Sequence, residues 1–137
     1  MPVPSLYERV GGLPYFERLA ETFYNDVAAD SLLRPMYPHD QELGPAKRRL
    51  ALFLVQYWGG PTTYLAERGH PRLRARHAPY VIGALERDRW LHHMRAAIDA
   101  SDAREAEREE LHAYMTLAAD AMINTETASN PSQGAGR

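Results

Sequence analysis

The sequence predicts an all-α fold, and three observations support this prediction. Ser5 and Glu8 have the spacing of a capping box, in which two side chains satisfy free backbone groups at a helix start. In the segments that follow, apolar residues recur at three- and four-residue steps, which is the period of a buried helix face. No two segments form a convincing pair of strands, and the sequence contains no internal repeat.

The first half of the chain is expected to contain three helices. The capped helix ends at Gly11-Gly12, and Pro14 begins the next helix, because proline is tolerated in the first helical turn. Asp30 then caps a short segment broken by prolines, which leaves Tyr37 in a corner with little freedom. A third helix is expected over residues 45–58. The predicted core residues are Phe16, Leu19, Phe23 and Val27 in the second helix, and Ala46, Leu50, Phe53, Leu54 and Tyr57 in the third.

The second half is expected to contain a mobile or weakly helical connection over residues 62–69 and two long helices, over 85–100 and 103–124. The charged segment 104–110 is interpreted as a solvent-exposed face of the last helix. The predicted core residues are Trp90, Leu91, Met94, Ala97 and Ile98 in the first of these helices, and Leu111, Tyr114, Leu117, Ala118, Ala121 and Met122 in the second.

Length and composition limit the classes of function. The 137 residues suffice for one domain with a core and a cofactor cavity, which we place at residues 1–124, followed by a disordered polar tail at 125–137. Sixteen basic and eighteen acidic residues give a net charge of -2, which disfavours nucleic-acid binding. The chain has no cysteine and no evident signal peptide, and both observations favour a cytoplasmic protein. Its longest uncharged stretch, residues 50–66, is too short to span a membrane.

One histidine has a setting typical of a metal ligand. His77 ends an arginine-rich segment between Pro71 and Pro79, which we interpret as a short helical turn. Leu73 precedes it by four residues and therefore shares its face. An imidazole above an apolar face, with guanidinium groups nearby, suits a flat apolar cofactor that carries carboxylates, such as haem. A lone histidine in such a place is nevertheless more often a structural side chain.

Several motifs together resemble one known family, the second group of bacterial truncated globins. The resemblance covers residues 5–124. It implies a two-over-two helical sandwich around one haem b, in which the helices pack at steep angles around the cofactor. The motifs that carry it are Gly11-Gly12, Phe23-Tyr24, Met36-Tyr37-Pro38, and the segments 56–61, 69–77 and 86–90.

The resemblance also implies roles for individual residues. His77 becomes the proximal iron ligand. Tyr24, Tyr37 and Trp90 become the hydrogen-bonding groups of the distal wall, with Leu50 as an apolar neighbour. Ala46 stands where many globins have a distal histidine or glutamine, so hydrogen bonding passes to the tyrosines and the indole. The expected contacts with the haem propionates and the pocket walls come from Arg49, Arg76, His70, Phe53 and Leu73.

These roles imply a haem protein that reversibly binds dioxygen, and also nitric oxide, carbon monoxide or sulfide, at a five-coordinate iron. The alternative is a haem enzyme with peroxidase-like or nitric-oxide dioxygenase activity. The chain has no flavin or nicotinamide domain, so such an enzyme would take electrons from an external reductase. A homodimer is left open as a further partner. A third reading, a helical nucleic-acid-binding module built on Arg68, Arg72, Arg74 and Arg76, is disfavoured by the acidic composition.

Overall fold

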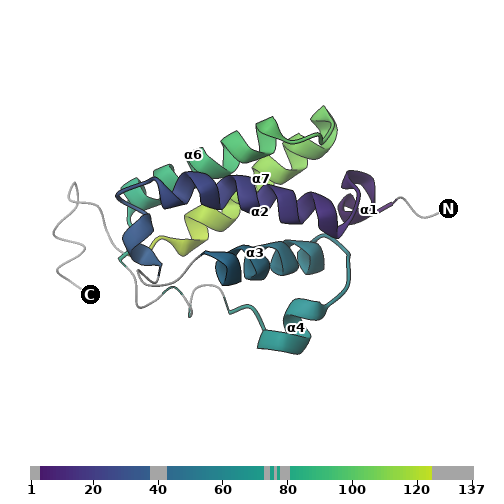
Figure 1. The fold of residues 1–137 in the computed structure, drawn as a ribbon, viewed down its shortest axis with the longest axis horizontal. Helices are drawn as coiled ribbons and strands as arrows, with labels where there is room; N and C mark the ends of the chain where they lie inside the picture. The colour runs from purple at the N-terminus through teal and green to yellow at the C-terminus, as the bar shows by residue number, and fades with distance from the viewer. Residues whose placement is uncertain (1–3, 38–42, 73–74, 76, 78–80, 125–137) are drawn as a thin grey trace.

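The structure is a computed structural model that describes residues 4–37, 43–72, 75, 77 and 81–124. All regular secondary structure in these ranges is helical, which confirms the predicted fold class (Figure 1). The expected disordered tail, residues 125–137, lies outside them. The elements are α1 (Leu6–Val10), α2 (Leu13–Ala28), the 3₁₀ turn η1 (Arg34–Met36), α3 (Gly44–Tyr57), α4 (Thr63–Arg68), α6 (Ala84–Ala100) and α7 (Glu105–Met122).

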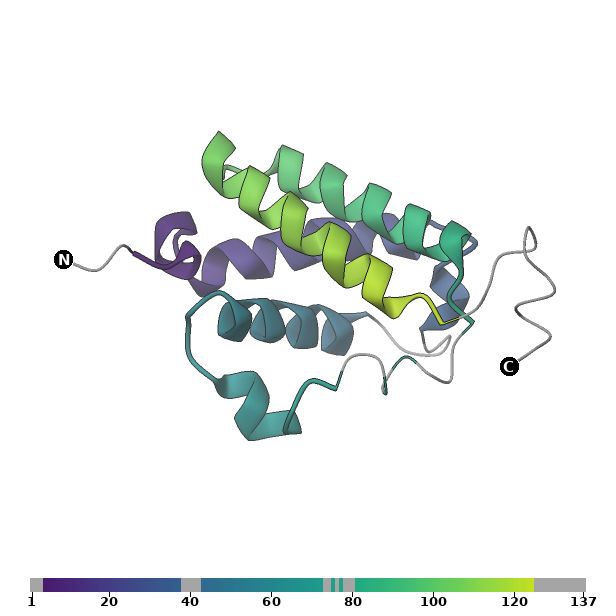
Figure 2. The ribbon, with the colours of Figure 1, turned by 180° about the vertical axis from the view of Figure 1, so that it is seen from behind.

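Two pairs of helices build the fold. α2 packs against α3 in one pair, α6 packs against α7 in the other, and α2 also contacts α6. Figures 1 and 2 show α6 and α7 running antiparallel on one side of α2, with α3 on the other side and α4 beyond it. This arrangement is the two-over-two helical sandwich that the resemblance implied.

The buried face of α2 is the one that its sequence pattern predicts. Phe16, Phe23 and Val27 are fully buried, and Leu19 is 2% exposed. The capping box of α1 is also present, since Ser5 Oγ accepts a hydrogen bond from Glu8 N and a Glu8 carboxylate oxygen accepts one from Ser5 N, both at 3.2 Å. Local pattern and capping therefore place the first two helices correctly.

A glycine at the end of α3 permits close packing between α1 and α3. A Cβ atom added to Gly60 would lie 2.6 Å from Val55 Cγ1 and 2.7 Å from the ring of Tyr7. The Tyr7 amide donates a hydrogen bond to the Trp58 carbonyl, at 3.1 Å, in the same contact. A larger residue at position 60 would push these segments apart.

The stretch after α3 is more ordered than the sequence predicted. Residues 62–69, expected to be a mobile or weakly helical connection, contain helix α4. Tyr64 is buried there against Phe53, and Glu67 forms an ion pair with Arg48 at 2.6 Å. One buried aromatic side chain thus anchors a helix of only six residues.

The predicted core of α7 was partly wrong. Leu111, Met115 and Ala119 form the buried stripe, whereas Leu117 is 70% exposed and Ala121 is also exposed. Residues 111, 115 and 119 follow one another at four-residue steps and so share a face, which positions 117 and 121 do not. Other helices pack against α7 on one side only. The apolar residues of α7 are therefore buried on that side and exposed elsewhere.

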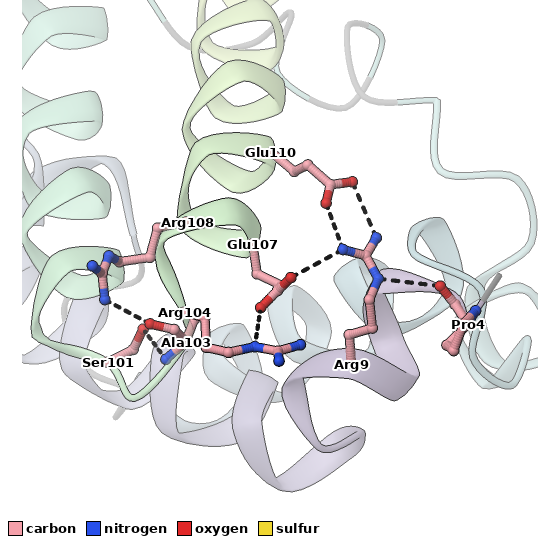
Figure 3. A network of polar contacts seen from close by, with 8 residues as sticks. All are labelled: Pro4, Arg9, Ser101, Ala103, Arg104, Glu107, Arg108 and Glu110. Carbon is pink, nitrogen blue, oxygen red and sulfur yellow. Dashed lines mark hydrogen bonds and ion pairs between the residues drawn. The ribbon is translucent and has the colours of Figure 1, made fainter.

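The expected solvent-exposed face at the start of α7 was wrong for Glu107. This residue is only 4% exposed, and its carboxylate accepts hydrogen bonds from Arg9 at 3.1 Å and from Arg104 at 2.9 Å. Arg9 also pairs with Glu110 at 2.7 Å, as Figure 3 shows. The contact joins α1 to α7. A pairing partner almost a hundred residues away in sequence leaves no local sequence signal.

Candidate functional site

A cavity of about 400 Å³ lies among α2, η1, α3, α6 and α7. This volume is within the range of roughly 300–1,000 Å³ that small-molecule and cofactor sites occupy. Its walls combine apolar side chains with a few polar groups, which is the usual composition of such sites. The residues of the predicted site that line it are Tyr24, Tyr37, Ala46, Arg49, Leu50, Phe53, His77 and Trp90.

One described residue of the predicted site, His70, does not appear in this wall. His70 is exposed and lies outside the cavity lining, and its Nδ1 accepts a hydrogen bond from the Arg72 amide at 3.0 Å. Leu73 and Arg76 lie outside the described residues. The structure therefore brings together the tyrosines, the tryptophan, the four α3 positions and His77, but it does not place His70 with them.

The two tyrosines and the tryptophan share one aromatic cluster. The rings of Tyr24 and Tyr37 meet edge to face with centroids 5.4 Å apart. Phe23, which packs beside Tyr24 at 4.9 Å, also contacts Trp90 at 5.2 Å. Two helices and the η1 corner thus deliver three polar aromatic groups to one side of the cavity, and Phe23 fixes the distances between them.

The environment of Tyr24 keeps its hydroxyl protonated. Burial, followed by the neighbouring Tyr37 phenol and a hydrogen bond with it, raises the pKa of Tyr24 well above its ordinary value. Arg49 opposes this shift only weakly. A phenol with a raised pKa is neutral at physiological pH and retains its proton for donation to a ligand.

The face of α3 that lines the cavity is apolar. Ala46, Leu50 and Phe53 follow one another at four- and three-residue steps, so all three point the same way. Ala46 is 6% exposed and presents only a methyl group. Apart from Arg49, which also lines the cavity from α3, hydrogen bonding on this part of the wall therefore has to come from other elements.

His77 contributes the imidazole of the cavity wall, and its main chain is tied to the end of α7. Asn124 Nδ2 donates a hydrogen bond to the His77 carbonyl oxygen at 3.2 Å. The Asn124 side-chain oxygen accepts a hydrogen bond from the main-chain amide of Ile82 at 2.9 Å. The main-chain amide of Asn124 in turn donates one to the Ile82 carbonyl at 2.9 Å. One asparagine therefore connects the segment that carries His77 to the α6–α7 pair.

Of the arginines that the structure describes, three line the same cavity. Arg49 was predicted here, whereas Arg68 and Arg87 were not. Arg87 pairs with Asp88 at 2.6 Å and also with Asp120, which holds it between α6 and α7. Guanidinium groups bind carboxylates through charge-assisted, often paired, hydrogen bonds. The cavity can therefore receive a ligand that carries carboxylates.

The donor set fits haem better than a bare metal ion. In the part of the chain that the structure describes, no three histidine, aspartate or glutamate side chains converge on a metal position. A lone imidazole thus needs a cofactor that brings the remaining metal ligands, as the four nitrogens of a porphyrin do. Flat apolar walls and bordering guanidinium groups suit the ring and the propionates of haem.

Comparison with known proteins decides the family. The model of the bacterial-like globin family matches residues 5–124. The chain belongs to the bacterial-like globins. Within that family it is a group II truncated haemoglobin, and the family implies a haem cofactor, dioxygen binding and a two-over-two fold.

The relatives of this truncated globin cover nearly all of its length. It is 40% identical to group 2 truncated hemoglobin YjbI of Bacillus subtilis, over 92% of this chain and 93% of the relative. A thermostable hemoglobin from Thermobifida fusca is 59% identical, with a TM-score of 0.85 over 88% of this chain and 98% of that chain. A truncated oxygen-avid haemoglobin from Bacillus subtilis is 39% identical, with a TM-score of 0.82 over 88% of this chain and 100% of that chain.

Sequence reasoning missed several residues of this globin's site. Phe23 was recognised as core but not as the link between Tyr24 and Trp90. For Arg68 and Arg87, the positive charge of the side chain was the only sequence signal that could have placed them at the site. Asn124 had none beyond its place at a helix end, because its partners lie 42 and 47 residues away.

In the described ranges, no helix is long and apolar enough to cross a bilayer.

Proposed function

We propose that this truncated globin binds haem b through His77 and holds dioxygen with hydrogen bonds from Tyr24, Tyr37 and Trp90. The observation that carries the proposal is that His77 lines the same cavity as Tyr24, Tyr37 and Trp90. The bound haem supplies an iron atom with an open position for a diatomic ligand. Nitric oxide, carbon monoxide and sulfide are further ligands of the same site.

The protein's own contribution is donation of hydrogen bonds. Tyr24 stays protonated because burial raises its pKa, and the Trp90 indole nitrogen can only donate. A ligand that gains partial negative charge in the pocket is stabilised by about 1.5–3 kcal/mol for each charge-assisted hydrogen bond. This corresponds to roughly 10- to 150-fold slower release. The three contributions need not add, because Tyr24 and Tyr37 are in contact and Phe23 packs against both Tyr24 and Trp90.

The remaining side chains hold the cofactor. Leu50 and Phe53 would pack against the porphyrin ring, and Ala46 leaves room beside it. Arg49 would pair with a propionate, and Arg68 or Arg87 is a further candidate for that contact, in addition to Arg76 and His70. Leu73 would complete the apolar wall. Support for these roles comes from the cavity lining for Ala46, Arg49, Leu50, Phe53, Arg68 and Arg87.

An absorption spectrum of the full chain mixed with hemin tests the proposal. We expect a Soret band and a stable oxygenated ferrous form in the wild type. His77→Ala should lose the spectrum of a histidine-bound haem and should regain it when imidazole is added. Absence of haem uptake by the wild type, or an unchanged fifth ligand in His77→Ala, would refute the proposal.

A second candidate function is an enzyme that acts on peroxide or nitric oxide at the same haem. The donors of the distal wall could also polarise a peroxide O–O bond or orient nitric oxide. In this second proposal, reducing electrons would come from an external reductase. Sustained turnover with peroxide and a phenol would support this function, and bleaching of the haem without turnover would oppose it.

Two further proposals concern the setting of the protein. We infer a cytoplasmic location from the absence of cysteine in the sequence, which suits a reducing compartment. We also keep the homodimer as a proposal. Light scattering after size-exclusion chromatography distinguishes a monomer from a dimer directly, and fractionation of cells that make the protein tests the location.

A further inference from the structure

A buried carboxylate, that of Asp30, lies outside the cavity lining. The Asp30 side chain, which follows the end of α2, is 2% exposed. Its Oδ1 accepts hydrogen bonds from the amides of Leu32 at 2.8 Å and Leu33 at 3.2 Å, and from Arg89 at 3.1 Å. Its Oδ2 accepts one from Arg89 at 3.1 Å and lies 2.6 Å from His93 Nε2.

This carboxylate is ionised at physiological pH. Burial alone would raise the pKa of Asp30, but hydrogen bonds from His93, from the Leu32 and Leu33 amides and from Arg89 lower it to about 2. An ionised carboxylate has no proton to give. His93 must therefore donate from Nε2, and every contact of Asp30 is a hydrogen bond that it accepts.

The donors come from the two segments that carry distal groups. Leu32 and Leu33 begin the corner that continues through η1 to Tyr37, and Leu33 itself lines the cavity. The Arg34 amide also donates to the Asp30 carbonyl at 2.8 Å, which fixes the start of this corner.

The other two donors lie on α6, on either side of Trp90 in the sequence. Arg89 directly precedes Trp90, and His93 lies three residues after it. The Arg89 side chain is about half exposed, yet its guanidinium reaches the buried carboxylate. One charged group is thus bonded both to the corner that leads to Tyr37 and to the helical turn that presents Trp90.

We propose that Asp30 is a positioning residue of the distal pocket, whose carboxylate fixes Tyr37 and Trp90 relative to each other and thereby slows ligand release. The inference rests on the proposed function, in which Tyr37 and Trp90 donate to the ligand. Asp30 does not touch the cavity and acts only through these two groups.

Replacing Asp30 with asparagine would disturb the link to α6 and leave the link to the corner at Leu32 and Leu33. The amide oxygen could still accept from the Leu32 and Leu33 amides at the place of Oδ1. The amide nitrogen would then replace Oδ2 and would face Arg89 Nε, so two donors would oppose each other in a buried site. Asp30→Asn therefore keeps the size of the side chain and the corner, and loosens the attachment of α6.

The test compares dioxygen dissociation from haem-loaded full-length variants by stopped flow. Asp30→Asn should speed release about three- to tenfold, which is the effect of weakening one hydrogen bond to the ligand. Asp99→Asn is the matched control, because Asp99 also pairs with a histidine, His112, at 2.8 Å, but its side chain is 66% exposed. The control should release dioxygen at the wild-type rate.

A double-mutant cycle separates positioning from a general structural effect. In a Tyr37→Phe, Trp90→Leu background, Asp30→Asn should no longer change the release rate, because the groups that it positions are absent. An equal acceleration in both backgrounds would overturn the inference. Hydrogen exchange of the haem-free protein adds an independent readout, with faster exchange in Asp30→Asn expected at residues 31–37 and 86–94.

Failure of the inference and failure of the proposed function give different results. If Tyr37→Phe and Trp90→Leu leave release unchanged, the proposed function is wrong. If they speed release and Asp30→Asn does not, the inference is wrong. Should Asp30→Asn fail to fold, Arg89→Gln removes one of the two links between Asp30 and α6, leaves the link through His93, and must show the same dependence on Tyr37 and Trp90 with a smaller effect. Unchanged release in Arg89→Gln would then overturn the inference.

Discussion

The side chain of Asn124 is bonded to the main chain of His77, 3.2 Å from Nδ2 to the carbonyl oxygen, across 47 residues of sequence. The same side chain accepts from the Ile82 amide. These two bonds fasten the segment carrying the proposed iron ligand to the end of α7. The position of His77 therefore depends on the last residue that the structure describes.

Asn124→Ala should weaken the hold on haem. Loss of two side-chain hydrogen bonds should lower the free energy of unfolding by about 1–3 kcal/mol and speed haem loss. Transfer of haem to an excess of a colourless haem-free globin measures the loss rate. Asn25→Ala, an exposed asparagine on α2, is the control and should behave as the wild type. Equal rates in Asn124→Ala and the control would show that the contact does not matter.

Trp90→Leu should speed dioxygen release by about tenfold or more, because the indole N–H is lost while an apolar side chain of moderate size remains. Stopped-flow dissociation of the oxygenated form measures the effect. Trp58→Leu is a useful comparison, since the Trp58 indole nitrogen is buried without a hydrogen-bond partner and Trp58 does not line the cavity. A release rate in Trp90→Leu no faster than that of the wild type would remove Trp90 from the set of ligand donors.

Asp30 should make the fold sensitive to acid. Its pKa in the folded protein, about 2, is below its ordinary value of 3.8, so the folded state holds the proton less tightly than the unfolded chain. The stability from this group is therefore complete above about pH 5 and is lost as the pH falls from there through 2. Urea unfolding at pH 6 and pH 3 should show a smaller decrease in stability for Asp30→Asn than for the wild type. Equal decreases would contradict the assignment.

Gly60→Ala should destabilise the protein by about 1–3 kcal/mol, because its Cβ would overlap Val55 and Tyr7 in tightly packed surroundings. Gly44→Ala is the matched control. Apart from its chain neighbours and the backbone of α3, no atom of the described residues lies within 4 Å of a Cβ added at Gly44, the first residue of α3, so this change should be neutral or stabilising by up to about 1 kcal/mol. Thermal unfolding of both variants measures the difference, and equal melting temperatures would show that the contact between α1 and α3 can relax.

Much of the fold was predictable because it depends on short-range pattern. The capping box at Ser5, the stripe on α2 and the common face of Ala46, Leu50 and Phe53 all involve residues within two turns of a helix. The errors have a different origin. Leu117 is as apolar as Leu111, and helical spacing alone cannot say that only Leu111 faces another helix.

Long-range polar contacts were the least predictable part of the site. Asp30 was recognised as a helix cap, which its bonds to Leu32 and Leu33 bear out. Its pairing with His93, 63 residues away, leaves no trace in either local sequence. Glu107 likewise has the local sequence of a solvent-exposed position and becomes buried only where α1 packs against α7.

The sequence by itself determined most of the helices, the family and many of the side chains that line the cavity, because each depends on residue type at short spacing. Only the tertiary structure decided which charges are buried, which apolar residues stay exposed and how His77 is tied to Asn124. The physical reason is that a local pattern specifies the face of a helix, whereas burial and pairing depend on which other face packs against it.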